Sequence, residues 1–196
     1  MDSYLNLISN IGDETRALAD QAGGLPCPID CFDCCRNTAT MSISLVEAKH
    51  LGIGLKTLPH PIQEHVQKKA ERTISKIEKE GYSEEGVVIA GTEAAETIKG
   101  HVESECPMLL GGVCIIYDYR PIICRVWGYP IQNNLEVACC KKTFLDSEAT
   151  TYKPLPYDQH WNDCKKLSGP LKSKQKEDAA HRIPICYFVQ NLLKSG

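Results

Sequence analysis

Cysteine is the residue type in this sequence that points most directly to chemistry. Eleven of the 196 residues are cysteines, an odd number, and two pairs of them are adjacent in the chain. The set is Cys27, Cys31, Cys34, Cys35, Cys106, Cys114, Cys124, Cys139, Cys140, Cys164 and Cys186. A chain of this length can bury a sufficient core without disulfides, and neighbouring cysteines bridge only through a strained ring. We therefore interpret the clusters as thiols that bind a metal or carry redox chemistry.

The first cluster runs from Cys27 to Cys35, and the prolines around Cys27 predict an irregular, tightly turning loop. Two cysteines separated by two residues can reach one ion from such a turn, and Cys31 and Cys34 have this spacing. Cys27 can join them from the preceding turn. Cys35 is expected to point away from Cys34, because adjacent side chains diverge, and so to serve a second metal or to pack as a small apolar group.

The second cluster contains Cys106, Cys114 and Cys124. Gly111–Gly112 allows a sharp reversal of the chain, so backbone N–H groups can approach sulfur closely. Pro121 suits the first position of a short helix. Cys124 would then lie in its opening turns, where free N–H groups favour a thiolate.

The residues around these thiols are expected to balance their charge and to limit solvent access. Arg120 and Arg125 can neutralise part of the negative charge of bound thiolates, with ordinary surface salt bridging as the alternative for both. Tyr117 belongs to the largely apolar surroundings. Cys139 and Cys140 form a second doublet that offers one more ligand.

The remaining cysteines are interpreted differently. Cys186 lies in an apolar run and is expected to be a buried structural thiol. Cys164 follows His160 closely, and both a ligand role and a structural role stay open for it.

The elements that position the clusters are predicted to be mainly helical. The predicted helices cover 3–22, about 45–51, 61–81, 93–103 and about 176–194, with a brief strand at 113–117 and a loop-rich stretch over 141–175. A capping box at Ser44–Glu47 opens the second of these helices. We expect a mainly α fold with an irregular, loop-built, cysteine-rich metal-binding core and little β structure.

The domain prediction follows from the same elements. The chain 1–196 is read as a single domain, with the cysteine-cluster core at 25–140 and a helical insertion at about 55–103. The stretch 141–196 is read as a loop-rich segment followed by a C-terminal helix.

Charge and hydropathy restrict the partners. The net charge is −3 and the pI about 6.1, so no overall field recruits nucleic acid or an anionic membrane. The sequence has no run of 18 or more apolar residues and no export leader, so we expect a cytoplasmic protein whose thiols stay reduced.

The spacing of both clusters is similar to that of a known family. The pattern Cys27-x3-Cys31-x2-Cys34-Cys35, followed by Cys106-Pro-x-Leu, Cys114-x-Ile-Tyr, Arg120-Pro and Cys124-Arg125, resembles the YkgJ-type cysteine-cluster family. That family is described as a zinc- or iron-chelating domain and once carried the label flagellin N-methylase. The resemblance covers about 25–140, and the opening spacing is x3 where many relatives have x2. It implies metal binding by Cys27, Cys31, Cys34, Cys35, Cys106, Cys114 and Cys124, with Cys139 or Cys140 as an eighth ligand.

The thiolate count and the absence of paired histidines define the expected cofactor. Seven or eight thiolates exceed the four that one structural zinc needs, which predicts two sites or one multinuclear cluster. All-thiolate sites accept both iron–sulfur clusters and zinc, and of the two we prefer the iron–sulfur cluster.

Three functions stay open at this stage. The first is a metal-binding protein with a structural or electron-transfer role. The second is a metalloenzyme of the methyl-transfer type, which is the weaker because the sequence has no glycine-rich nucleotide loop. The third is a module in which zinc fixes loops that bind a protein partner.

Overall fold

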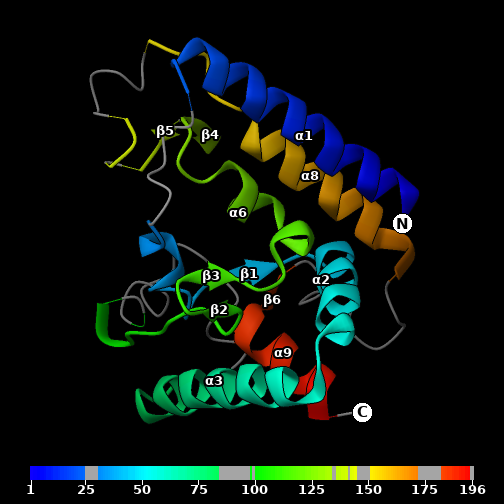
Figure 1. Cartoon of the computed structure of the whole chain (residues 1–196), viewed down its shortest axis with the longest axis vertical. Coiled ribbons are helices and arrows are strands. Elements are labelled where there is room, and N and C mark those ends of the chain that lie inside the picture. Colours follow the sequence, from blue (N-terminus) through cyan, green and yellow to red (C-terminus); the bar gives the residue numbers. More distant parts are fainter. Residues whose placement is uncertain are drawn as a thin grey trace. The chain divides into compact units, whose positions relative to one another are not determined.

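The computed structural model contains six α-helices and three two-stranded antiparallel sheets within the residues that it describes (Figure 1). The described residues are 1–24, 31–83, 98, 100–133, 136–140, 142–144, 151–171 and 182–194. The prediction of a mainly α fold with little β structure is confirmed for them.

The chain divides into two compact units. The first unit comprises Met1–Cys31 and Arg120–Gly169, and the second comprises Phe32–Tyr119 and Pro170–Gly196. Each unit is therefore built from two separate stretches of sequence. The single domain over 1–196 and its subdivisions stay predictions.

The first unit packs three helices and one small sheet. These elements are α1 (Asp2–Gln21), α6 (Ile122–Val126), α8 (Tyr157–Ser168), β4 (Ile131–Asn133) and β5 (Glu136–Ala138), with a 3₁₀ turn (Gly169–Leu171) beginning directly after α8. Helix α1 contacts both α6 and α8. It buries apolar residues at helical spacing, among them Ile11 and Leu18, which accounts for its length and its orientation. Between α1 and α8, His160 Nε2 lies 2.7 Å from Glu14 Oε2.

The helix expected at 3–22 is confirmed, with Tyr4 buried and Leu5 42% exposed. Two other predictions for the first unit need correction. The stretch 141–175 was expected to be rich in loops, and this is wrong for α8. Pro121 is the N-cap of α6 and not its first helical residue, so Cys124 is the third residue of that helix.

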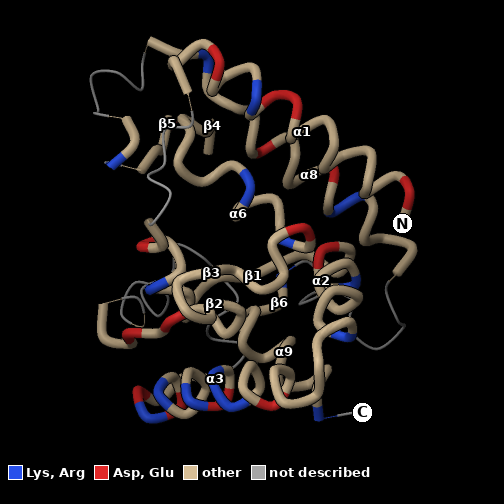
Figure 2. Tube along the Cα trace, in the orientation of Figure 1, with Lys and Arg blue, Asp and Glu red and all other residues tan. Residues whose placement is uncertain are grey.

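The second unit is built around α2 (Leu45–Thr57), α3 (His60–Lys79) and α9 (Ile185–Lys194). Helices α3 and α9 lie side by side (Figure 1). The apolar stripe predicted for α3, from Val66 to Ile77, is buried in a core that also contains Val189 of α9. Lysines, arginines and acidic residues are intermixed along the rest of α3 (Figure 2). The amphipathic pattern therefore directs one face of α3 into the core.

Short strands and turns complete the second unit. Strand β1 (Ser42–Ile43) pairs with β6 (Ile183–Pro184), and β2 (Leu109–Leu110) pairs with β3 (Val113–Cys114). The unit also contains two 3₁₀ turns. Turn η1 (Asp33–Cys35) precedes β1 in the sequence, and η2 (Tyr117–Tyr119) follows β3.

The capping box of the second unit is confirmed, because Ser44 N donates a hydrogen bond to Glu47 Oε2 at 2.8 Å and the Ser44 side chain accepts one from Glu47 N. Helix α2 nevertheless continues to Thr57, six residues past the end predicted at about 51. The C-terminal helix predicted at about 176–194 is confirmed over Ile185–Lys194, while Ile183–Pro184 form β6, and 176–181 lie outside the described residues.

The helix predicted at 93–103 and the strand predicted at 113–117 are confirmed in part. A helical hydrogen bond from Val102 N to Ile98 O measures 2.7 Å, and the other residues before 98 in that prediction lie outside the described residues. The strand ends at Cys114 and the chain turns into η2. Among the described helices, none is both long and apolar enough to cross a membrane.

Candidate metal centre

The second unit brings two cysteine-bearing segments together through their backbones. Cys106 N donates a hydrogen bond to Cys35 O at 2.6 Å, and Thr38 N donates one to Ser104 O at 3.0 Å. A parallel bridge between Asn37 and Ser104 belongs to the same pairing. The end of the first cluster therefore runs beside the start of the second, although about 70 residues separate them in the sequence.

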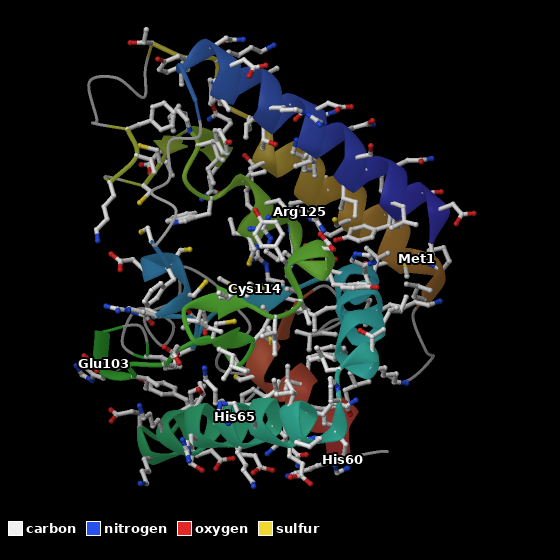
Figure 3. All side chains as sticks on the ribbon, viewed as in Figure 1. Met1, His60, His65, Glu103, Cys114 and Arg125 are labelled. Atoms are coloured by element: carbon white, nitrogen blue, oxygen red, sulfur yellow. The ribbon has the colours of Figure 1, made fainter. Side chains whose placement is uncertain are left out.

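A tight hairpin returns the chain from Cys106 to Cys114. Leu109 N donates to Cys106 O at 3.0 Å, and in the β2–β3 ladder Leu109 is the direct partner of Cys114. The two-residue loop is Gly111–Gly112, with φ values of +59° and +79°. Positive φ at both central residues is the requirement of the type I′ turn, which explains why two glycines stand there. Figure 3 labels Cys114 on this hairpin.

The doublet of the first cluster presents both of its thiols on one side. Cys34 Sγ and Cys35 Sγ lie 3.9 Å apart within η1. The expectation that Cys35 points away from Cys34 is therefore wrong. With Zn–S bonds of about 2.3 Å, two thiolates on one tetrahedral zinc are separated by about 3.8 Å. The doublet is thus spaced as two ligands of a single metal atom.

The turn η1 is held by contacts of its neighbours. The Arg36 guanidinium lies 4.6 Å from the centre of the Phe32 ring, a cation–π distance. A Cβ placed on Gly112 would lie 3.4 Å from the same ring, so Phe32 packs over the hairpin loop. The doublet and the hairpin are therefore linked by packing as well as by the backbone.

The thiol of Cys106 has a strongly raised pKa. Its pKa is raised from 9.0 to about 12, and burial is the largest cause. A backbone hydrogen bond at Met108 and the charge of Lys69 lower the pKa, whereas Cys114 and Cys34 raise it. The electrostatic influence of Cys34 and Cys114 indicates that three thiols share one neighbourhood. Cys106 and Cys114 also pack against the apolar core of the unit.

Lys69 of α3 is a residue of this neighbourhood that the sequence analysis did not identify. Its Nζ donates to Leu109 O at 2.5 Å and to Glu105 Oε2 at 2.6 Å, and its side chain is only 12% exposed. It is one of several lysines on an amphipathic helix, so the sequence carries no signal that separates it from the others.

The other predicted ligands belong to the first unit or lie outside the described residues. Cys31, Cys124, Cys139 and Cys140 are half-buried residues of the first unit, and Cys27 is outside the described part. Cys139 Sγ donates to Phe144 O at 3.7 Å, and Cys140 O accepts hydrogen bonds from Thr143 and Phe144. Their convergence with the cysteines of the second unit stays a prediction.

The structure shows the contacts or the exposure of the other residues that the sequence singled out. Arg125, labelled on α6 in Figure 3, donates from Nε to Arg120 O at 2.9 Å. Tyr117 lies in η2 and is 59% exposed. Cys164 and Cys186 are 0% and 2% exposed, as a structural thiol was expected to be at Cys186.

The described conformation does not form a finished metal site. Among the residues that the structure describes, no three or more histidine, cysteine, aspartate or glutamate side chains are placed to hold one ion. The chemistry of the donor set suits a thiophilic metal, and the geometry supplies one correctly spaced pair with two further thiols nearby.

Comparisons with known proteins gave no match: no family model, no curated protein and no solved structure is similar to this chain.

Proposed function

We propose that this protein binds a metal through cysteine thiolates, with Cys34, Cys35, Cys106 and Cys114 as the centre of the site. The observation that carries the proposal is the Cys34–Cys35 sulfur pair at 3.9 Å, set beside Cys106 by the hydrogen bond from Cys106 N to Cys35 O. Metal binding would draw the four thiols together as it deprotonates them, since ligation and folding are coupled in such sites.

The remaining candidate ligands extend this proposal. Cys27, Cys31, Cys124, Cys139 and Cys140 would supply a second site or a multinuclear cluster, as the resemblance to the YkgJ-type family implies. The role is structural or electron-transferring.

The spacing of the doublet bears on the identity of the metal. Two thiolates 3.9 Å apart suit zinc, or an iron of a [2Fe–2S] cluster, because each of these atoms takes two or more protein thiolates. A [4Fe–4S] cluster, by contrast, uses its four cysteines on four irons. Iron–sulfur and zinc both stay within the proposal.

A second candidate is an interaction module whose loops are fixed by zinc. It is favoured by an exposed apolar pair at the end of the hairpin, because Val113 is 63% exposed and its direct partner Leu110 is 36% exposed. An apolar side chain presented on a metal-supported loop suits contact with a protein partner.

Elemental analysis with sulfide determination, on protein purified without air, tests the proposal. Iron with equimolar sulfide and absorbance near ~400 nm would indicate an iron–sulfur cluster, whereas colourless protein with bound zinc would favour the structural or interaction role. Protein that retains neither metal, and takes up neither on reconstitution, contradicts it.

Single substitutions locate the ligands. Cys106→Ser and Cys114→Ser should each release metal and lower the unfolding temperature of the metal-loaded protein, because an incomplete thiolate set binds weakly. Cys186→Ser is the matched control in the same unit, since that thiol is 2% exposed and packs in the apolar core. Metal lost from Cys186→Ser but kept in Cys114→Ser would refute the assignment.

A further inference from the structure

Lys69 contacts residues on both sides of Cys106, one of the proposed ligands. Glu105 precedes Cys106, and its carboxylate lies 2.6 Å from Lys69 Nζ. Leu109 O accepts from the same ammonium at 2.5 Å, while Leu109 N donates to Cys106 O at 3.0 Å. One ammonium group therefore contacts both ends of the turn from Glu105 to Leu109.

The charge of Lys69 lies next to the segment that carries Cys106. Its ammonium group contacts Glu105, which directly precedes Cys106, and Leu109 O, three residues after it. The side chain of Lys69 is 12% exposed, so solvent screens this charge poorly. A cation in this position offsets the negative charge of a site built from thiolates.

A site of several thiolates needs such a cation. Four thiolates around one divalent ion leave a net charge of −2, and mutual repulsion in a partly desolvated site weakens binding. The sequence analysis assigned this role to Arg120 and Arg125. Both arginines belong to the first unit, whereas Lys69 belongs to the second unit together with Cys106 and Cys114.

We infer that Lys69 is a positioning residue of the thiolate site, which holds the Glu105–Leu109 turn in place and supplies positive charge beside Cys106. This inference rests on the proposed metal-binding function. It assigns a role to α3, the helix in the predicted insertion, whose outer face otherwise looks like an ordinary solvated surface.

Helix α3 offers a matched control for the charge. Lys76 lies seven residues further along and donates from Nζ to Glu103 O at 2.6 Å. It therefore also clamps the backbone of the cysteine-bearing segment, but at a residue three positions before Cys106 and not directly next to it. Lys76→Met removes the same charge and a similar clamp.

The test is a Zn²⁺ titration of the metal-stripped full-length chain, in competition with a chromophoric chelator and without air. Lys69→Met should weaken Zn²⁺ binding about tenfold or more, and Lys69→Arg, which keeps the charge, should restore most of the loss. Lys76→Met should stay within about threefold of the wild type.

Glu105→Gln separates the charge from the clamp. It leaves Lys69 without its competing carboxylate, so the ammonium acts more fully on the thiolates and Zn²⁺ binding should strengthen about two- to fivefold. If Lys69 acts only by holding the turn in place, Glu105→Gln should instead weaken Zn²⁺ binding, since the turn loses its ion pair with Lys69.

Two results overturn the inference while leaving the proposed function intact. One is equal Zn²⁺ binding by Lys69→Met and Lys76→Met in a wild-type protein that binds zinc. The other is weaker binding by Glu105→Gln. A wild-type chain that binds neither zinc nor iron overturns the proposed function itself, and the inference with it. Circular dichroism of each metal-free variant shows that a loss of binding is not a loss of fold.

Discussion

At the doublet Cys34–Cys35, side-chain rotation decides what neighbouring thiols can do. The expectation that Cys35 points away from Cys34 followed from the divergence of adjacent Cα–Cβ bonds alone. Each sulfur lies one rotatable bond further out, and in η1 both rotate to within 3.9 Å of each other. A rotamer depends on tertiary surroundings, so the sequence pattern could single out these two cysteines but not the geometry of their sulfur atoms.

Cys106 gives a pH dependence at the scale of a single residue. Its pKa is raised from 9.0 to about 12, mainly by burial, so folding favours the neutral thiol. This contribution to stability is fully present below pH 9 and is lost as the pH rises through the folded-state pKa.

The expected result is that metal-free wild-type protein loses stability between pH 9 and 12 more steeply than Cys106→Ala does. Urea unfolding at several pH values across this range measures the difference between the two. A gap that stays constant over the range would show that the Cys106 thiol does not titrate in this way.

Helices whose apolar residues repeat at helical spacing were predictable at the scale of the element. Both α1 and α3 follow from that periodicity, and the start of α2 follows from Ser44 and Glu47. Helix α8 was missed because its buried face includes polar residues, His160 and Ser168, and because Pro154 and Pro156 precede it closely. A search for apolar residues at helical spacing therefore does not detect the buried face of this helix.

Helix α2 is longer than the sequence predicted, and its Gly54 permits close packing. A Cβ on Gly54 would lie 2.5 Å from two ring carbons of Tyr119 and 2.8 Å from its Cβ. These atoms are near the Tyr119 backbone, so a rotation of the ring does not relieve the clash. Gly54 therefore permits η2 to pack against α2, as the contact between His50 and Tyr119, at 5.0 Å between ring centres, also indicates.

Gly54→Ala should destabilise the protein by about 1–3 kcal/mol, although alanine favours a helix more than glycine does. Gly12→Ala in α1 is the control, because a Cβ there meets nothing within 4 Å. It should stabilise by about 0.5–1 kcal/mol. Urea unfolding of both variants checks the opposite signs, and a stabilising Gly54→Ala would contradict the packing argument.

At the scale of the whole molecule, the second unit depends on residues from the end of this sequence. Strand β6 pairs with β1, and α9 contributes its apolar face to the core beside α3. The sequence predicted the two helices as separate elements and neither of the two strands, and it contained no sign that 183–194 completes the unit that holds Cys34, Cys35, Cys106 and Cys114. Long-range pairing of this kind depends on many weak contacts and leaves no local pattern.

Val189→Ala tests this dependence. Val189 is 0% exposed in the core of the second unit, so the substitution should cost about 1–3 kcal/mol and weaken metal binding with it. The matched control is Val113→Ala, at a residue that is 63% exposed, where the cost should be below about 0.5 kcal/mol. Thermal unfolding with and without metal measures both, and equal effects would contradict the role given to α9.

The discontinuous second unit has a consequence for biosynthesis. Residues 120–169 separate its two stretches, and at about 5–20 residues per second a ribosome needs about 3–10 seconds to translate them. During that interval the thiols at 34, 35, 106 and 114 are already joined to the nascent chain while α9 does not yet exist. The order of translation therefore sets a period in which these sulfur atoms depend on the reducing power of their surroundings for protection.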